Sequence, residues 1–320
     1  MKKIILVILA LVFLVSFSAM PVAAKGKAAA SWYVPTDFDT IQQAVDSAQP
    51  GDIIRVEAGN HAGAVINKQV VIKGIEGAVI STGVPYKSGS PLTTAFRLDA
   101  GADGTEISHL VIPNDVGTLY FFAIFSRDVD EVLLHQLNIT NSVQAISNYN
   151  GSDWNISHNT ITGTNAVNGG GIGIMINAWD GTADYVPDGT QANNNLITHN
   201  YTEGKIGDVG FSGPGILLSS GHGASQYPGG TLTDNIVYQN TCIYTGDNGV
   251  GFEADDVPWE LSLGASITGN SVIYNDFRGS TSAIEWFGDI TLNTVSRNFL
   301  DAASDRGEGA DAVKPPDIFN

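Results

Sequence analysis

The sequence predicts an all-β protein, a solenoid in which short parallel strands stack coil upon coil behind an N-terminal capping helix. Seven segments share one pattern, an aliphatic residue followed three positions later by Asn or Leu. A second register between these segments places a small residue before an apolar one. Such self-similarity, with a period of roughly 20 to 50 residues, is typical of stacked units that cannot bury their apolar faces alone. We therefore expect one domain of roughly nine or ten coils.

The capping helix is expected at the start of this domain. Asp39 and Gln42 have the spacing of a capping box, and residues 41–48 place apolar side chains on one face before Pro50 and Gly51 end the helix. A short amphipathic helix can cover the apolar cross-section that stacked coils expose at their ends. Strand-like runs follow at residues 52–57, 64–67, 70–73 and 79–80, with turn residues between them.

Two ladders account for the rest of the domain. The fourth positions of the first pattern are Leu110, Leu137, Asn159, Asn200, Asn240, Asn270 and Asn298. The small residues of the second register are Ala95, Ala123, Ala145, Gly173, Gly215, Gly249 and Ala283. Stacked amides that hydrogen-bond along the solenoid at a coil bend explain the Asn positions. The histidines one or two positions before this bend, at 109, 135, 158 and 199, lack the spacing of metal ligands.

The N-terminus has the pattern of a secretory signal peptide. Lys2 and Lys3 precede an apolar run that continues to about Phe17, and small residues follow at 22–24. An uncleaved membrane anchor is the alternative, but the run is shorter than the ~20 residues of a spanning helix. We expect a signal peptide at 1–24, the solenoid domain at 25–300 and a polar tail at 301–320. The protein would then be secreted, periplasmic or on the cell surface, without stable membrane insertion after cleavage.

Charge and cysteine content exclude several partners. The chain has 15 Lys and Arg against 33 Asp and Glu, a formal charge of −18 that becomes −20 when Lys2 and Lys3 leave with the leader. Nucleic acid is excluded, because its binding needs a basic surface. A polyanionic glycan would be repelled unless bound cations or a local Arg patch offset the field. Cys242 is the only cysteine, so it forms no intramolecular disulfide and is expected in the core.

The first coils resemble those of right-handed parallel β-helix proteins. The segments that carry the resemblance are FDTIQQAVD at 38–46, GDIIRV at 51–56 and VVIKG at 70–74. That superfamily includes pectin methylesterases, pectate lyases, polygalacturonases and periplasmic NosD-like proteins, and it implies a single-stranded right-handed parallel β-helix. The motifs typical of pectin methylesterases are absent. The shared scaffold leaves the chemistry open, because its families differ in activity.

Two outward rows of side chains are expected to run along one sheet of this solenoid, one residue per coil. The Arg97 row contains Arg97, Phe125, Ser147, Met175, Leu217, Gly251 and Glu285. The Arg127 row contains Asp99, Arg127, Tyr149, Asn177, Ser219, Glu253 and Phe287. An exposed sheet of such varied chemistry predicts a groove, in which Arg127, Tyr149, Asn177 and Glu253 would contact substrate. Trp179 and Trp259 would stack on sugar rings, and the long loops at 163–171, 181–195 and 201–213 would wall the site.

Acidic residues beside this sheet could supply catalysis. Asp180, His222 and Asp255 follow the sheet in three successive coils, with Asp256 adjacent to the last. Polygalacturonase-like hydrolases also carry an Asp pair and a Gly-His-Gly on neighbouring coils, although here the order is reversed and their Arg-x-Lys motif is absent. Inverting hydrolysis needs a protonated carboxyl and a carboxylate ~6.5–9.5 Å apart, and crowding of carboxylates raises one pKa. The resemblance thus implies Asp180, Asp255 and Asp256 as acid and base, with His222 as a further catalytic candidate.

Other interpretations of the same residues remain open. The acidic loops could simply be solvated, since such loops are common in a strongly acidic protein. They could also bind Ca²⁺, the one cofactor that the residues suggest, because hard oxygen ligands suit it. The predicted function is an exported polysaccharide-active protein, with a glycoside hydrolase as its enzymatic form and a polysaccharide or cell-surface glycan as partner. The alternatives are a non-catalytic, NosD-like glycan-binding or structural protein and a Ca²⁺-dependent polysaccharide lyase; the sequence does not indicate an oligomeric state.

Overall fold

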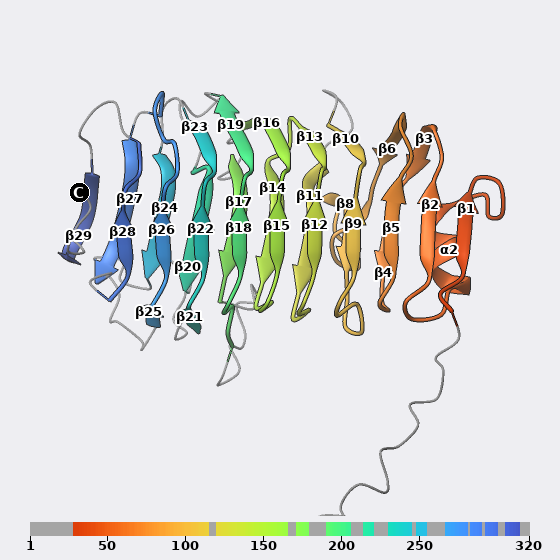
Figure 1. Cartoon of the computed structure of the whole chain (residues 1–320), viewed down its shortest axis with the longest axis horizontal. Helices are drawn as coiled ribbons and strands as arrows, with labels where there is room; N and C mark the ends of the chain where they lie inside the picture. Colours follow the sequence, from red (N-terminus) through yellow and green to blue (C-terminus); the bar gives the residue numbers. More distant parts are fainter. Residues whose placement is uncertain are drawn as a thin grey trace, which may run out of the picture.

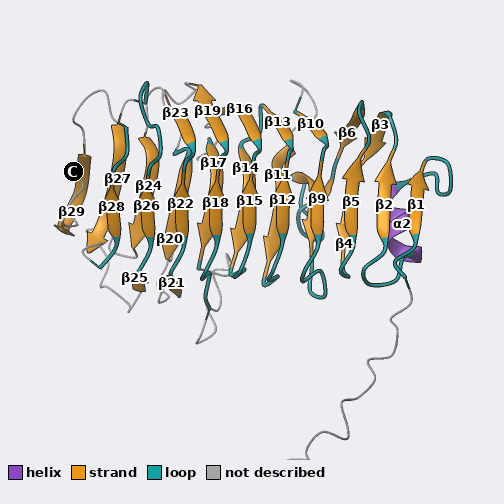
Figure 2. Ribbon diagram, in the orientation of Figure 1, coloured by secondary structure: helices purple, strands orange, loops and turns teal. Residues whose placement is uncertain are grey.

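Three parallel sheets wind around one apolar core. The computed structural model describes residues 28–114, 120–165, 171–178, 190–205, 214–220, 230–244, 248–254, 266–280, 282–289, 292–299 and 305–313. Their strands lie side by side along the long axis, with helix α2 (Ile41–Ser47) at one end and the last strand at the other (Figure 1). Figure 2 shows how little of the fold is helical. No helix among the described residues is long and apolar enough to span a bilayer.

The sheets are named A, B and C by their order along a coil. Sheet A contains, in spatial order, β1 (Ser31–Val34), β2 (Ile53–Val56), β5 (Val71–Gly74), β9 (Glu106–Ser108), β12 (Leu133–His135), β15 (Asn155–Ser157), β18 (Leu196–Thr198), β22 (Ile236–Tyr238), β26 (Ser271–Ile273) and β28 (Thr294–Ser296). Sheet B contains β3 (Gly59–Ala62), β6 (Ala78–Thr82), β10 (Val111–Pro113), β13 (Asn138–Thr140), β16 (Thr160–Asn165), β19 (Tyr201–Lys205) and β23 (Thr241–Tyr244).

Sheet C carries the predicted groove. It contains β4 (Ala64–Ile66), β8 (Thr93–Leu98), β11 (Tyr120–Arg127), β14 (Gln144–Tyr149), β17 (Ile172–Asn177), β20 (Ile216–Ser220), β24 (Asn248–Ala254), β27 (Ser282–Asp289) and β29 (Asp305–Val313). A short strand, β7 (Val84–Pro85), pairs with β8 in antiparallel register. A separate small sheet joins β21 (Thr231–Thr233) to β25 (Ser266–Thr268). Residues 305–313 of the expected polar tail thus form the last strand of sheet C.

The core is a set of inward rows, as the repeats predict. In sheet A the strand register stacks one apolar residue per coil, and all of them from Ile54 onward are buried. This row contains Ile54, Ile72, Ile107, Leu134, Ile156, Ile197, Val237, Val272 and Val295. Each such side chain contributes about 1.5–3 kcal/mol when fully buried. Cys242 of β23 is a buried free thiol in this core, as expected, and burial raises its pKa to about 12.

Two ladders of buried amides run beside sheet A. In the first, the backbone N–H and the side-chain amide of each Asn donate to the Oδ1 of the Asn in the next coil, as in Asn159 to Asn200 at 3.0 and 2.9 Å. Its members are Asn159, Asn200, Asn240, Asn275 and Asn298. The second ladder contains Asn195, Asn235, Asn270 and Asn293. These bonds satisfy backbone groups that the bends would otherwise bury without partners.

One predicted member of the first ladder was wrong. Asn270 belongs to the second ladder, and Asn275 occupies the position that the sequence pattern assigned to it. The reason is that the bends before and after sheet A both place Asn three residues after an aliphatic residue. A sequence pattern that assigns one Asn to each coil can therefore pick the Asn of either bend. The bend histidines are where the pattern predicted them. His109, His158 and His199 have a left-handed backbone, with φ of 58°, 57° and 55°.

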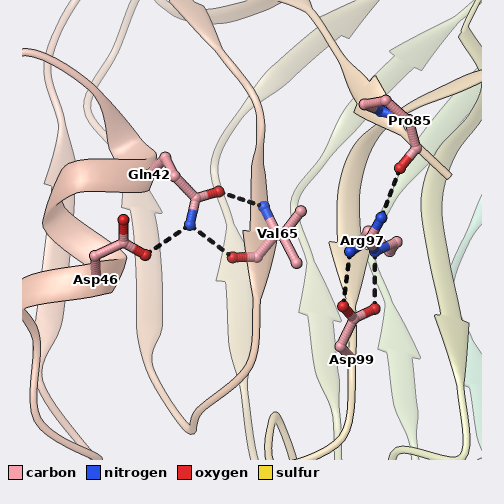
Figure 3. Close-up of polar contacts among 6 residues, drawn as sticks. All are labelled: Gln42, Asp46, Val65, Pro85, Arg97 and Asp99. Carbon is pink, nitrogen blue, oxygen red and sulfur yellow. Dashed lines mark hydrogen bonds and ion pairs between the residues drawn. The ribbon is translucent and has the colours of Figure 1, made fainter. Parts of the chain in front are cut away.

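Helix α2 covers the first coil as predicted, but with a different cap. Its buried face includes Ile41, Ala44 and Val45. The capping box is formed by Thr40 and Gln43, one residue later than the expected pair of Asp39 and Gln42. Gln42 is turned instead toward β4. Its amide accepts from the Val65 N–H at 2.8 Å and donates to the Val65 carbonyl at 3.2 Å, so it pairs the edge of sheet C (Figure 3).

Candidate functional site

The outward rows of sheet C are aligned as the sequence predicts. Strand register stacks Arg97, Phe125, Ser147, Met175, Leu217, Gly251 and Glu285 in consecutive coils. It likewise stacks Arg127, Tyr149, Asn177, Ser219, Glu253 and Phe287. Three of the predicted substrate contacts, Arg127, Tyr149 and Asn177, therefore lie in adjacent strands, each about 4.8 Å from the next.

The expectation that this face is exposed was wrong in the middle of the sheet. The relative exposures of Ser147, Met175, Asn177 and Ser219 are 0%, 3%, 4% and 1%. Strand alternation decides only that a side chain points away from the coil axis; whether solvent reaches it depends on what the rest of the chain places over the sheet. Arg127 and Tyr149 are half-buried, so solvent reaches the Arg127 row at the part of sheet C where these two residues lie.

A hairpin extends over this end of sheet C. Residues 84–92, here called the Tyr86 arm, begin with β7 and return to β8. The Tyr86 ring packs against Phe122 and Phe125 of β11, with centroids 5.3 and 5.2 Å apart. Phe122 and Phe125 are themselves 4.9 Å apart and buried. An aromatic cluster thus fixes the arm against β11, and such pairs contribute about 0.5–1.5 kcal/mol each beyond their buried area.

A hollow of about 240 Å³ lies between the arm and the sheet. Its lining residues are Tyr86, Lys87, Ser88, Arg97, Asp99, Phe125 and Arg127. Three cations and one carboxylate give this lining a formal charge of +2 within a strongly acidic protein. The charge of Arg97 is paired, because its guanidinium donates twice to Asp99 at 2.8 Å and once to the Pro85 carbonyl at 2.9 Å (Figure 3). The positive field therefore comes from Lys87 and Arg127.

Arg127 is held by rings on both sides. Its guanidinium carbon lies 6.0 Å from the centroids of both Phe125 and Tyr149. Its Nε is buried and has no hydrogen-bond partner among the described residues. A buried donor without a partner costs about 1–3 kcal/mol, and more when it carries charge. Such a group needs a hydrogen-bond partner, which an ordered water or a bound ligand can supply.

Asn177 presents the complementary group two strands away. Its Oδ1 is buried and, within the part of the chain that the structure describes, accepts no hydrogen bond. Between the Arg127 donor and this acceptor lies the Tyr149 ring. The Arg127 row thus offers a donor, an aromatic ring and an acceptor in line. Such an arrangement can bind a molecule that has both donors and acceptors and an apolar face.

Comparison with known proteins identifies the architecture. The solved structure of the Streptococcus pneumoniae surface protein and adhesin PfbA matches with a TM-score of 0.51 and 14% identity, over 86% of this chain and 82% of that one. With the stacked parallel sheets already described, this decides the fold. The chain is a right-handed parallel β-helix protein.

Two enzymes of this β-helix architecture are also similar. An alginate lyase from Paenibacillus sp. str. FPU-7 matches with a TM-score of 0.45 and 14% identity, over 85% of this chain and 96% of that one. A family 28 exopolygalacturonase from Yersinia enterocolitica matches with a TM-score of 0.45 and 12% identity, over 90% of this chain and 64% of that one. No protein-family model and no curated protein matches the sequence. At these identities the likeness is one of fold.

The other predicted site residues cannot be placed in the β-helix. Trp179, Asp180, His222, Asp255, Asp256 and Trp259 lie outside the described residues. The backbone of Glu253 pairs with Ser219 and Phe287, which puts it in the Arg127 row. Among the residues that the structure describes, no group of three or more His, Cys, Asp or Glu side chains could hold a metal ion. A Ca²⁺ site in the acidic loops stays a prediction.

The sequence reasoning missed Tyr86 and Lys87. A signal was present, since the segment at 83–92 interrupts the repeat with several turn residues and has no counterpart in the next coils. A second hollow, of about 410 Å³, lies beside helix α2 and is lined by Asp37, Phe38, Asp39, Gln43, Asp46 and Ser47. It contains three carboxylates and no cation, and none of its polar side-chain atoms is both buried and unpaired. The hollow under the Tyr86 arm is therefore the stronger candidate.

Proposed function

We propose that this β-helix protein is polysaccharide-active and binds a glycan at the Arg127 end of sheet C, where Arg127 and Tyr149 are half-buried. One observation carries the proposal: the buried Arg127 Nε and Asn177 Oδ1 both lack partners among the described residues and flank one aromatic ring. Sugar hydroxyls both donate and accept, so they can satisfy the two groups at once. The C–H face of a pyranose can pack on Tyr149 as other apolar surfaces do.

Charge favours an acidic sugar at this end of sheet C. Lys87 and Arg127 give the hollow its surplus positive charge, because the Arg97 charge is paired with Asp99. This is the local cationic patch that a polyanionic glycan needs on a protein of charge −18. Nucleic acid remains excluded as a partner, because a patch of this size cannot release enough counterions to overcome the overall charge.

The catalytic part of the proposal concerns residues beside sheet C. Asp180, Asp255 and Asp256 would supply the acid and base of inverting glycoside hydrolysis, with His222 as a further catalytic group. We expect Asp255→Asn to abolish glycan cleavage and leave thermal unfolding nearly unchanged. The measurement is release of reducing ends together with a melting curve. Cleavage by the variant at the wild-type rate would remove Asp255 from the catalytic set.

A non-catalytic glycan-binding protein is the second candidate. The described groups around Arg127 favour it, since they can bind and orient a sugar and the carboxylate of the hollow, Asp99, is paired with Arg97. A Ca²⁺-dependent lyase is the third candidate and would need the acidic loops to hold the ion. We propose export for all three, because residues 1–24 have the pattern of a signal peptide.

One panel experiment separates these candidates. The protein is screened on neutral and acidic polysaccharides, with and without chelator, for binding, for new reducing ends and for the ultraviolet absorbance of unsaturated products. A hydrolase yields reducing ends without that absorbance, a lyase yields both and stops with chelator, and a binder yields neither. Failure to bind any glycan on the panel would refute the proposed function.

A further inference from the structure

The outer face of sheet A differs in charge from the rest of this acidic chain. The first and third residues of its strands point away from the core, and from β9 onward a bend residue with a left-handed backbone follows each strand. Glu106 is the only carboxylate at these positions, all of which the structure describes, and it pairs with His135 at 3.0 Å. Three cations, Arg55, Lys73 and Arg297, lie on the same face. The face thus has a formal charge of +2 on a protein of charge −18.

These cations belong to a row of basic and ring side chains with one member in every coil. The row, here called the Lys73 row, contains Tyr33, Arg55, Lys73, His109, His135, His158, His199, Tyr238, Tyr274 and Arg297. It follows the ten strands of sheet A, which lie side by side along the long axis (Figure 1). None of its members is buried, and half of them are exposed. Solvent therefore reaches the Lys73 row along its whole length, which is not true of the middle of sheet C.

Neighbouring members from β15 to β28 are in contact. The His158 and His199 rings are stacked in parallel, with centroids 5.0 Å apart. The rings of Tyr238 and Tyr274 continue the line, since centroid distances from His199 to Tyr238 and from Tyr238 to Tyr274 are 6.1 and 5.8 Å. Arg297 donates to the Tyr274 hydroxyl and lies 5.4 Å from the centroid of its ring. This half of the row is thus a continuous strip, one side chain wide.

The carboxylates on the other side of sheet A are distant from this strip. Glu131, Asp153 and Asp234 lie at the bend that precedes the sheet. Asp153 comes five residues before His158, which is roughly 15 Å along a strand. Salt at physiological strength screens charges beyond ~8 Å. An anionic chain on the Lys73 row is therefore attracted by the adjacent cations and little repelled by these three carboxylates.

The spacing of charge in the row fits an acidic polysaccharide. Successive members are about 4.8 Å apart, so the three cations are spread over roughly 43 Å. Duplex DNA carries one charge per ~1.7 Å, far more than so few cations neutralise. A chain of uronate sugars carries only one carboxylate per sugar. Its hydroxyls can bond to the imidazoles of the row, and its C–H faces can pack on the Tyr rings.

We infer that the Lys73 row is a binding surface for an acidic polysaccharide, which lies as a single chain along the axis of the β-helix. This surface goes beyond the proposed function, because it is on a different sheet from the Arg127 end of sheet C. It requires nothing of that site, and either surface can bind glycan without the other.

Chemical footprinting tests the inference at the row itself. Diethyl pyrocarbonate acylates exposed imidazoles, and mass spectrometry of the peptides reports on His158 and His199 separately. We expect polygalacturonate to protect both rings in the full-length mature protein, and dextran, a neutral glycan, to leave them reactive. Equal reactivity with and without polygalacturonate would overturn the inference, and so would equal protection by dextran or by duplex DNA. Protection that grows with protein concentration in the absence of glycan would mean that a second copy covers the row, and would also overturn it.

Matched variants locate the binding. Arg55→Gln with Lys73→Gln removes two cations of the row, whereas Lys68→Gln with Arg278→Gln removes one Lys and one Arg outside sheet A. The first pair should raise the polygalacturonate concentration needed for half-protection roughly 2- to 30-fold, and the second pair should leave it unchanged.

Arg127→Met separates this inference from the proposed function. It should keep the protection of His158 and His199 even where it loses affinity at sheet C. If the first pair stays folded by circular dichroism and its histidines are protected at the wild-type concentration, the Lys73 row does not bind the chain.

Discussion

The two arginines of the hollow should respond to the same substitution in opposite ways. Arg127→Met removes a guanidinium whose Nε is buried without a partner in the described structure, and whose charge lies near those of Lys87 and Arg97. Removing the unpaired donor relieves the folded state of a cost of about 1–3 kcal/mol. Losing the contacts with the Phe125 and Tyr149 rings costs about 0.5–1 kcal/mol each. The two effects nearly cancel, and relief of the repulsion from Lys87 and Arg97 favours the variant, so the free energy of unfolding should stay about the same or rise slightly.

Affinity should move the other way. If Arg127 supplies a hydrogen bond from a charged group to the glycan, its loss costs about 1.5–3 kcal/mol of binding. This corresponds to a dissociation constant that is roughly 10- to 150-fold higher. Arg97→Met is the matched control, because it breaks the bonds to Asp99 and Pro85. The pair is part-exposed, so that variant should lose about 1 kcal/mol of stability.

The assay combines urea unfolding with calorimetric titration of an acidic oligosaccharide. The account expects Arg127→Met to unfold at or above the wild-type urea midpoint and to bind weakly. It expects Arg97→Met to unfold earlier. If Arg127→Met is as destabilised as Arg97→Met and binds like the wild type, Arg127 is a structural residue and the reasoning fails.

Three further predictions concern the scaffold. Asn200→Ala leaves the Asn159 N–H without its side-chain acceptor and removes one of the two acceptors of the Asn159 amide, so it should cost about 1–3 kcal/mol of unfolding free energy. The exposed Asn138→Ala should stay within about 0.5 kcal/mol, and equal urea midpoints would contradict this. Burial raises the pKa of Cys242 to about 12, so iodoacetamide should label it in mildly alkaline solution only after denaturant is added. The hydrogen bond from the Arg278 side chain holds the pKa of Asp276 below its ordinary value. The Asp276 carboxylate therefore stabilises the fold at pH values above that ordinary pKa, and this stabilisation is lost as the pH falls through the lowered pKa of the folded state. Asp276→Asn should therefore show a shallower loss of urea midpoint in acid, and an unchanged acid slope would count against the interaction.

Much of the fold could be predicted because repetition is encoded position by position. The aliphatic row through Ile156 and Ile197 and the outward row through Arg127, Tyr149 and Asn177 follow from counting along each coil. Stacking then fixes which side chains are neighbours. For this reason three of the site residues could be found without any knowledge of tertiary contacts.

The errors arose where local patterns are degenerate or where contacts between distant segments decide. Asn270 and Asn275 have the same local spacing, and only the strand register distinguishes their ladders. Asp39 with Gln42 and Thr40 with Gln43 are both plausible caps in sequence. Contact with β4 removes Gln42 from that choice. The burial of the middle of sheet C has the same origin, since strand alternation carries no information about what covers a face.

The Tyr86 arm could not be predicted for a related reason. Nothing in its own sequence specifies that it folds back over β11, because its position depends on two rings, Phe122 and Phe125, that come more than thirty residues later. Its irregular composition was the only local sign of it. Functional insertions in repeat proteins commonly interrupt the pattern in this way.

A crystal structure of the protein with a bound acidic oligosaccharide would test the central claim most directly. The account predicts sugar at the Arg127 end of sheet C, with an oxygen accepting from Arg127 Nε, a hydroxyl donating to Asn177 Oδ1 and a ring face on Tyr149. Sugar bound elsewhere, with both of those groups hydrogen-bonded by the protein's own side chains, would contradict it.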